Sequence, residues 1–332
     1  MSETRYPGLD AFKLAAAFLV VAIHTSPLTT YTLTGDVFLT RVLGRVAVPF
    51  FFMVTGHFVL GPILQGRRSL WPTCRKLLLL YGLAVLLYLP LGLYAGHYDG
   101  LTPAHALRLL LFDGTFYHLW YFPACVMGLG LLAGAGRFLS QKGLFLLAGI
   151  LYLAGLSGDS YYGLATLLPG VEQAWDWAFQ LFSYSRNGLF FPPLFLLLGA
   201  WLGQRPTAPK PKAWALGFFL SLAAMTAEAF LLRHWDAPRH DSMYLLLPVV
   251  MVFLYRLLMV WTPSPHPACR TLSTVLYVVH PAMIVVVRGA AEVLGLTSLL
   301  VENSLVHYGA VCLLSLALAW AVVKITEKQK RA

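Results

Sequence analysis

Long apolar runs alternate with short polar connections along nearly the whole chain. Most runs reach about 20 residues, the length at which a helix crosses the hydrocarbon core of a bilayer, and they lack the two-residue alternation of barrel strands. The pattern predicts an all-α, polytopic transmembrane helical bundle. About ten spans are expected, over residues 9–28, 42–62, 73–95, 118–137, 143–157, 188–203, 213–232, 242–261, 272–294 and 304–324.

Composition and charge agree with this class. Hydrophobic residues make up 58% of the chain and charged residues 11%, with a mean hydropathy of +0.70. Soluble domains carry about 25% charged residues. The net charge of +10 comes mostly from Lys and Arg in short connections. Their bias toward one side predicts that both termini are cytoplasmic. The charge therefore reflects topology, and no nucleic-acid partner is expected.

The remaining motifs exclude several chemistries. The chain lacks GxSxG, HExxH and Walker-type motifs, and its ten histidines and four cysteines show no metal-ligand spacing. We therefore expect free buried thiols and no metal. The first apolar run is expected to be retained rather than cleaved as a signal peptide. We expect a single membrane-embedded domain over residues 1–332, with a short amphipathic outer segment at about 165–183.

The first predicted span carries two ionisable residues, Lys13 and His24. Eleven residues are nearly three helical turns, so both side chains share one face, separated by a rise of about 16 Å. Ionisable groups in a bilayer cost about 2.5–3.5 kcal/mol each and are functional candidates for that reason. The alternatives are a lysine that snorkels to the cytoplasmic surface and a structural histidine with satisfied ring nitrogens.

Further polar residues lie near predicted span ends. Arg45 opens RVAVPFFFM, where Pro49 permits a kink, and its guanidinium suits either an anion or an interfacial anchor role. His118 and Trp120 lie in YHLWYFPA, which also has the composition of an interfacial aromatic belt. The other candidates for donor or acceptor binding are Arg186, Asn187, Asp241 and His280. Arg186 and Asn187 precede a double proline that is expected to break or widen a helix.

Taken in order, these motifs resemble the acyltransferase-3 family of integral membrane proteins. The resemblance rests on Lys13 and His24 with ten residues between them, on the segment from Arg45 to Phe51, and on YHLWYFPA and LYVVHP. It covers essentially all 332 residues. It implies a multi-pass protein of the bacterial cytoplasmic membrane.

The resemblance implies transfer of an acyl group, commonly acetyl, from cytoplasmic acyl-CoA to a hydroxyl or amine, and not of an aminoacyl group. The acceptor is expected to be a glycan or cell-envelope component, with acetyl-CoA as donor substrate and no permanently bound cofactor. His24 would be the general base or a transient acyl carrier, with Lys13 guiding the anionic part of the donor or tuning His24. Arg45 and His118 would position substrates, and Trp120 would wall the tunnel. The basic residues expected to dock the CoA phosphates, or alternatively to act only as positive-inside anchors, are Arg67, Arg68, Arg75 and Lys76.

A narrower resemblance supports a second hypothesis. GDSYYGL, RNGLFFPPLFLLLG and HDSMYLLLPVV resemble the membrane domains of vancomycin-resistance serine racemases. Those proteins add a soluble pyridoxal-phosphate racemase domain that these residues lack, so no racemase activity is expected here. The second hypothesis is L-serine transport, in which Arg45 pairs with the carboxylate and Asp241 or Asp159 takes the ammonium. A third is a non-catalytic sensor or partner-binding module, which predicts that Lys13 and His24 tolerate replacement.

Overall fold

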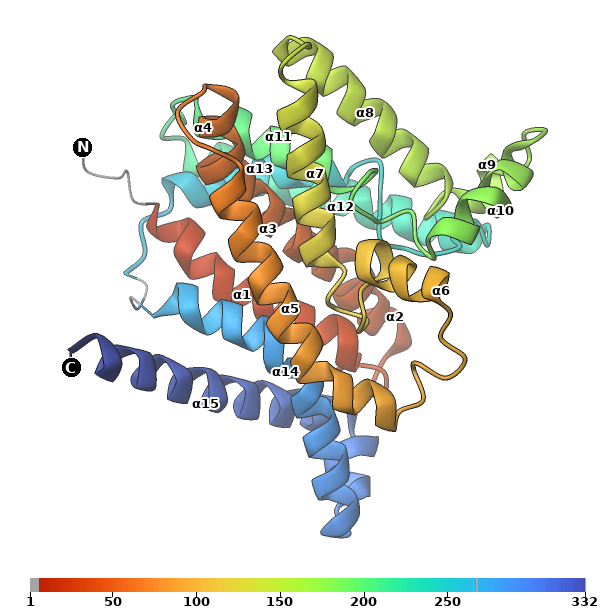
Figure 1. Cartoon of the computed structure of the whole chain (residues 1–332), viewed down its shortest axis with the longest axis vertical. Helices are drawn as coiled ribbons and strands as arrows, with labels where there is room; N and C mark the ends of the chain where they lie inside the picture. The colour runs from red at the N-terminus through yellow and green to blue at the C-terminus, as the bar shows by residue number, and fades with distance from the viewer. Residues whose placement is uncertain (1–5, 265, 267, 332) are drawn as a thin grey trace. The chain divides into compact units, whose positions relative to one another are not determined.

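The computed structural model describes residues 6–264, 266 and 268–331, and every regular element among them is a helix (Figure 1). The predicted all-α class is confirmed for these residues; residues 1–5, 265, 267 and 332 of the predicted domain lie outside them. Among the described residues, six segments are long and apolar enough to cross a membrane. They are α1 (Pro7–Thr25), the run Leu33–Leu64, α5 (Trp71–Tyr94), α12 (Pro211–His234), α14 (Cys269–Val293) and Ser304–Thr326 of α15 (Ser304–Arg331).

Four shorter apolar helices complete the set: α7 (Tyr121–Ala135), α8 (Gln141–Ser157), α11 (Pro192–Gly203) and α13 (Leu247–Val260). Together with the six longer segments they follow the order of the predicted spans. How many of them cross the bilayer stays a prediction, as does the cytoplasmic location of both termini. The short elements outside the ten are α6 (Pro103–Arg108), η4 (Leu109–Asp113), α9 (Tyr162–Ala165), α10 (Val171–Leu181) and η5 (Ser298–Glu302).

The second span begins earlier than predicted, at residue 33 instead of 42. Its helix changes pitch instead of stopping, which lets it continue through glycines and past Pro49. The consecutive pieces are α2 (Leu33–Val37), η1 (Phe38–Val42), η2 (Leu43–Val46), α3 (Ala47–Thr55), η3 (Gly56–Leu60) and α4 (Gly61–Leu64).

Three local predictions need correction. The double proline does not break a helix; it starts α11, because proline at the first helical positions loses no backbone hydrogen bond. His118 and Trp120 precede α7 and so do not belong to a span. His280 lies near the middle of α14 instead of near its end. Helix α10 lies within the segment expected at about 165–183, and in it Trp175 is buried while Trp177 is exposed; its position on the outer surface stays a prediction.

The chain forms two compact units. The first consists of Met1–Val48, Thr207–Leu222 and Val250–Ala332. Its core joins α1, α14 and α15, with Ala17, Leu276 and Val311 buried together. A second cluster places Leu272 of α14 against Ala319 of α15, with Leu14 of α1 beside it. The carboxyl-terminal hairpin α14–α15 therefore packs onto the first helix of the chain.

The second unit consists of Pro49–Pro206 and Ala223–Val249, and α11 is central to it. This helix packs against α4, η3, α7 and α8. Helix α11 comes so close to the run Leu33–Leu64 that a Cβ on Gly199 would lie 2.0 Å from the Met53 carbonyl oxygen. A Cβ on Gly56 would lie 2.0 Å from that of Leu196. Glycine is required here because the backbones themselves are in contact.

Candidate functional site

Helices α1 and α14 run side by side in the same direction within the first unit (Figure 1). Their direction follows from two contacts, one near the start of each helix and one farther along. Asp10 binds Arg270, and the His24 ring stacks on that of His280. The pairing joins the two ends of the sequence and brings three of the predicted site residues together: Lys13, His24 and His280.

A charged triad occupies the first of these contacts. Arg270 grips the Asp10 carboxylate with two nitrogens, Nε to Oδ1 at 2.8 Å and Nη2 to Oδ2 at 2.9 Å. Lys13 Nζ lies 2.9 Å from the same Oδ1. The carboxylate is buried, the Lys13 side chain is 14% exposed and that of Arg270 is 58% exposed. One negative and two positive groups give the triad a net charge of +1.

The second contact is a pair of histidines. Their ring centroids lie 5.3 Å apart and the ring planes meet at 23°. His280 is fully buried, whereas His24 is partly exposed. The stack thus holds the partly exposed ring of His24 against a fully buried one.

A proline determines the tautomer of His280. Pro281 has no N–H to donate to the carbonyl of Tyr277, four residues earlier in α14. His280 Nδ1 lies 2.8 Å from that carbonyl oxygen and 3.3 Å from the one of Leu276. A carbonyl only accepts, so Nδ1 carries the proton of the neutral ring. Pro281 therefore removes one helical hydrogen bond, and the His280 ring donates to the carbonyl that this leaves.

Arg45 lies in the same unit, on η2, which packs against α1. It is buried, 8% exposed, so the simple interfacial anchor does not describe it. A Cβ added to the neighbouring Gly44 would meet the Ile23 side chain at 2.9 Å. The segment that carries Arg45 therefore lies along the histidine end of α1.

A second group of predicted residues forms in the second unit. The Arg186 guanidinium carbon lies 5.3 Å from the centroid of the Trp120 ring and 4.5 Å from that of Tyr184. These are cation–π distances, and they hold the guanidinium between two aromatic faces. Asn187 instead closes the turn before α11: its Nδ2 donates to the Tyr184 carbonyl and its Oδ1 accepts from Leu189 N–H. These two contacts are typical of a structural residue in a turn.

His118 is buried in an aromatic box in the same unit. Its ring centroid lies 4.9 Å from that of Tyr88, 5.9 Å from that of Phe116 and 5.7 Å from that of Tyr117. All three rings present an edge-to-face geometry. The box positions His118 firmly, and what it does for a substrate stays a prediction.

The two carboxylates considered for an ammonium group both have partners. Asp241 forms an ion pair with Arg233 at 2.9 Å. Asp159 is fully buried after α8, and its Oδ1 accepts from the backbone N–H of Ser242 at 2.7 Å and of Met243 at 2.9 Å. Burial raises the pKa of Asp159 to about 6, although those amides and the nearby charge of Arg186 favour the ionised form.

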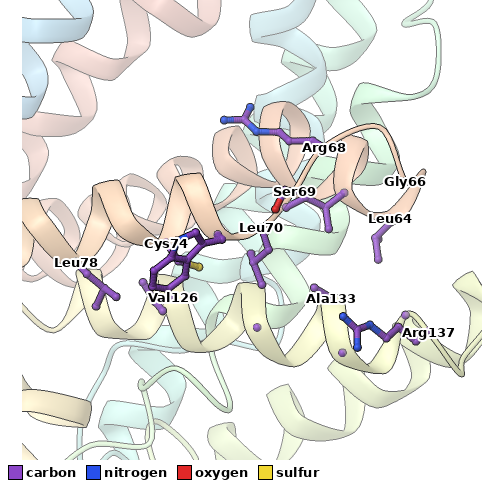
Figure 2. A pocket seen from close by; sticks show the side chains of 15 residues that line it. Leu64, Gly66, Arg68, Ser69, Leu70, Cys74, Leu78, Val126, Ala133 and Arg137 are labelled. Atoms are coloured by element: carbon purple, nitrogen blue, oxygen red, sulfur yellow. The ribbon is translucent and has the colours of Figure 1, made fainter.

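One residue of the predicted docking loop lines a cavity of about 840 Å³ in the second unit. Figure 2 shows Arg68 and Arg137 at this cavity with apolar side chains of α5 and α7, among them Leu78 and Val126. Arg68 is held by bonds to the Phe58 carbonyl and the Thr73 hydroxyl. The exposed residues Arg67, Arg75 and Lys76 are not among the lining residues.

Two members of the first site were missed from the sequence. Asp10 stands three residues before Lys13, a spacing that places both on one helix face and was available as a signal. Arg270 offered no such signal, because its partner Asp10 lies 260 residues away in the sequence. Among the described residues, no three His, Cys, Asp or Glu side chains are grouped so that they could hold a metal ion.

Comparisons with known proteins bear on this site. The sequence profile described as an acyltransferase domain, that of the acyltransferase-3 family, matches residues 6–324. The chain is 39% identical over 98% of its length to an amino-acid racemase of Enterococcus faecalis, of which it covers 46%. It is 38% identical over 93% of its length to a serine/alanine racemase of Enterococcus gallinarum, of which it covers 45%.

The chain therefore spans about half the length of the curated relatives it matches. No solved structure matches it. The profile covers both helices of the histidine pair, and the long apolar helices agree with it. The chain is a multi-pass membrane protein that belongs to the acyltransferase-3 family.

Proposed function

We propose that this protein transfers an acyl group, acetyl in the simplest case, from acyl-CoA to a hydroxyl or amine of a cell-envelope or glycan acceptor. The observation that carries the proposal is the histidine pair His24–His280, three helical turns from a cationic triad on the same two helices. Membership of the acyltransferase-3 family supports the reaction class.

The separation of the two contacts fits an acyl-CoA. The eleven residues from Lys13 to His24 rise about 16 Å along α1. In acyl-CoA, about fourteen bonds join the phosphorus on the pantetheine side of the diphosphate to the acyl carbon. The extended length of that chain is about 17 Å. A diphosphate near Lys13 thus brings the thioester carbonyl to His24. A free amino acid such as L-serine is too short to reach from Lys13 to His24.

His24 is the general base in this proposal. It takes the proton of the acceptor hydroxyl as the oxygen attacks the thioester carbon. The carbon–oxygen bond forms, the carbon–sulfur bond breaks, and the CoA thiolate leaves with the proton that His24 received. His280 holds the His24 ring in place through the stack. Arg45, on the segment beside this end of α1, is a cation for the developing oxyanion.

The remaining predicted residues stay proposals with narrower roles. Arg186, held between Trp120 and Tyr184, is suited to bind an anionic group of the acceptor. Arg68, at the cavity of the second unit, is suited to bind a phosphate group, and Arg67, Arg75 and Lys76 would add long-range attraction for an anion. L-serine transport has less support, because Asp241 and Asp159 already bind an arginine and two backbone amides.

Acetyl-CoA turnover by purified protein in lipid nanodiscs tests the proposal, with free CoA release as readout. We expect His24→Ala to lower turnover by about 10²-fold or more while acetyl-CoA still binds, because only the base is lost. Lys13→Ala should weaken binding of acetyl-CoA. His105→Ala, which replaces an exposed histidine of α6, is the matched control and should leave both quantities unchanged.

L-serine binding is measured in parallel. Saturable L-serine binding by protein that has no affinity for acetyl-CoA would overturn the proposal in favour of transport. If His24→Ala turns over acetyl-CoA as fast as the wild type, His24 is not the general base, and a non-catalytic role of this site is favoured.

A further inference from the structure

We propose that α14 supplies half of the donor site: Arg270 binds the phosphates of the acyl donor together with Lys13, and Asp10 is the positioning residue that holds both cations. The inference rests on the proposed function, because it names two further residues of that site. Neither residue has a role in the reaction as described so far.

The basis is a repeated arrangement on two parallel helices. On α1, Lys13 precedes His24 by eleven residues; on α14, Arg270 precedes His280 by ten. The corresponding rises are about 16 Å and about 15 Å. The cations of the two helices share one carboxylate, and the histidines share one stack. Lys13 of α1 therefore corresponds to Arg270 of α14, and His24 corresponds to His280.

Arg270 is better suited than Lys13 to meet a phosphate from the aqueous side. Its side chain is 58% exposed, whereas that of Lys13 is 14% exposed. A guanidinium presents five N–H donors in a planar fork, of which two bind Asp10 here. A fork of this kind matches the geometry of a phosphate. Arg270 thus forms the entrance, and Lys13 lies deeper, on the way to His24.

Asp10 explains how the side chains of Lys13 and Arg270 stay close together. Lys13 Nζ and Arg270 Nε both lie within 3 Å of its Oδ1, so like charges that would repel are held by one buried carboxylate. Counted together, these three groups carry a net charge of +1, which favours an anion. In this arrangement Asp10 acts through the two cations and does not touch the donor.

The test is binding of CoA itself, measured calorimetrically on the full chain in nanodiscs, so that no acyl transfer is required. We expect Arg270→Gln to weaken CoA binding about tenfold or more, the usual effect of losing a charge-assisted hydrogen bond. Arg270→Lys should recover part of the loss, because it restores the charge without the fork. Arg288→Gln, an exposed arginine farther along α14, is the matched control and should bind as wild type.

Kinetics separate a donor site from a merely structural ion pair. Arg270→Gln should raise the KM for acetyl-CoA with little change in kcat, since His24 is untouched. Asp10→Asn should weaken CoA binding in the wild-type background and have a smaller effect in the Arg270→Gln background, because one of the two cations that Asp10 positions is then already absent.

The outcomes keep the two proposals distinct. If wild-type protein binds neither CoA nor acetyl-CoA, the proposed function fails. If wild-type protein binds CoA and Arg270→Gln binds it equally well, the proposed function stands and the role of Arg270 is wrong. A loss for Arg288→Gln equal to that for Arg270→Gln would also refute it, because the effect would then be general charge. Additive effects of Asp10→Asn and Arg270→Gln would refute the positioning role of Asp10.

Discussion

Asp159 makes the stability of the second unit depend on pH in a direction opposite to that of most carboxylates. Its pKa in the folded protein is about 6, against an ordinary value of 3.8, with burial as the largest cause. The folded state therefore holds this proton more tightly than the unfolded chain does. Stability from this group is fully present below about pH 4 and is lost as the pH rises through about 6.

The size of the effect follows from the difference between the two pKa values. About two pH units at 1.36 kcal/mol each give a loss of about 3 kcal/mol between pH 4 and pH 7. Asp159→Asn cannot titrate, so the wild type should lose this amount relative to the variant over that range. At roughly 2 °C per kcal/mol, the difference in thermal midpoint should change by about 6 °C.

Thermal unfolding in detergent, followed by tryptophan fluorescence at several pH values, measures this difference. All other titrating groups are common to both proteins and cancel in the comparison. Asp176→Asn, which removes an exposed carboxylate of α10, is the control and should give a difference that does not vary with pH. A flat difference for Asp159→Asn, or one that grows in favour of the wild type as the pH rises, would refute the reasoning.

Two further predictions concern backbone packing and the hydrogen bonds of one carboxylate. Gly199→Val should destabilise the protein by about 3 kcal/mol or more, because its Cβ would lie 2.0 Å from the Met53 carbonyl oxygen; Gly149→Val, at a position with no atom within 4 Å, should be tolerated. A thermal midpoint for Gly199→Val equal to that of Gly149→Val would contradict this. Glu228→Ala should cost about 2–4 kcal/mol, because Glu228 accepts from the Tyr161 hydroxyl and from two backbone amides before α13. Glu228→Gln, which keeps one acceptor oxygen, should lose less, and equal losses for the two variants would argue against the hydrogen-bond account.

The fold class and the order of the apolar segments were predictable because they depend on local sequence. Twenty apolar residues need a helix in lipid whatever their neighbours are. The early start of the second span was not predictable in this way. Changes of pitch through η1 and η2 carry the helix past polar residues such as Thr40 and Arg41, which a hydropathy pattern treats as a boundary.

The candidate site was predictable only where its residues lie close in sequence. Lys13 and His24 share a helix, and their spacing places them on one face. The partners of these residues come from α14, and no pattern within α1 or α14 indicates that the two helices pack in parallel. The ion pair between Asp241 and Arg233 was not predicted either, because the two residues do not share a helix whose spacing would indicate the contact.

The pairing of α1 with α14 has a consequence for how the protein is made. Asp10 and Arg270 are 260 residues apart, so the ribosome supplies the arginine roughly 13–50 s after the aspartate. The second unit has all its residues once Val249 has been synthesised, whereas the first still lacks α14 and α15. During that interval Lys13, three residues away on the same helix, is the partner that Asp10 already has. Helix α1 thus gains its partner α14 only after the residues of the second unit have been synthesised, and the histidine pair exists only in chains that have been translated past His280.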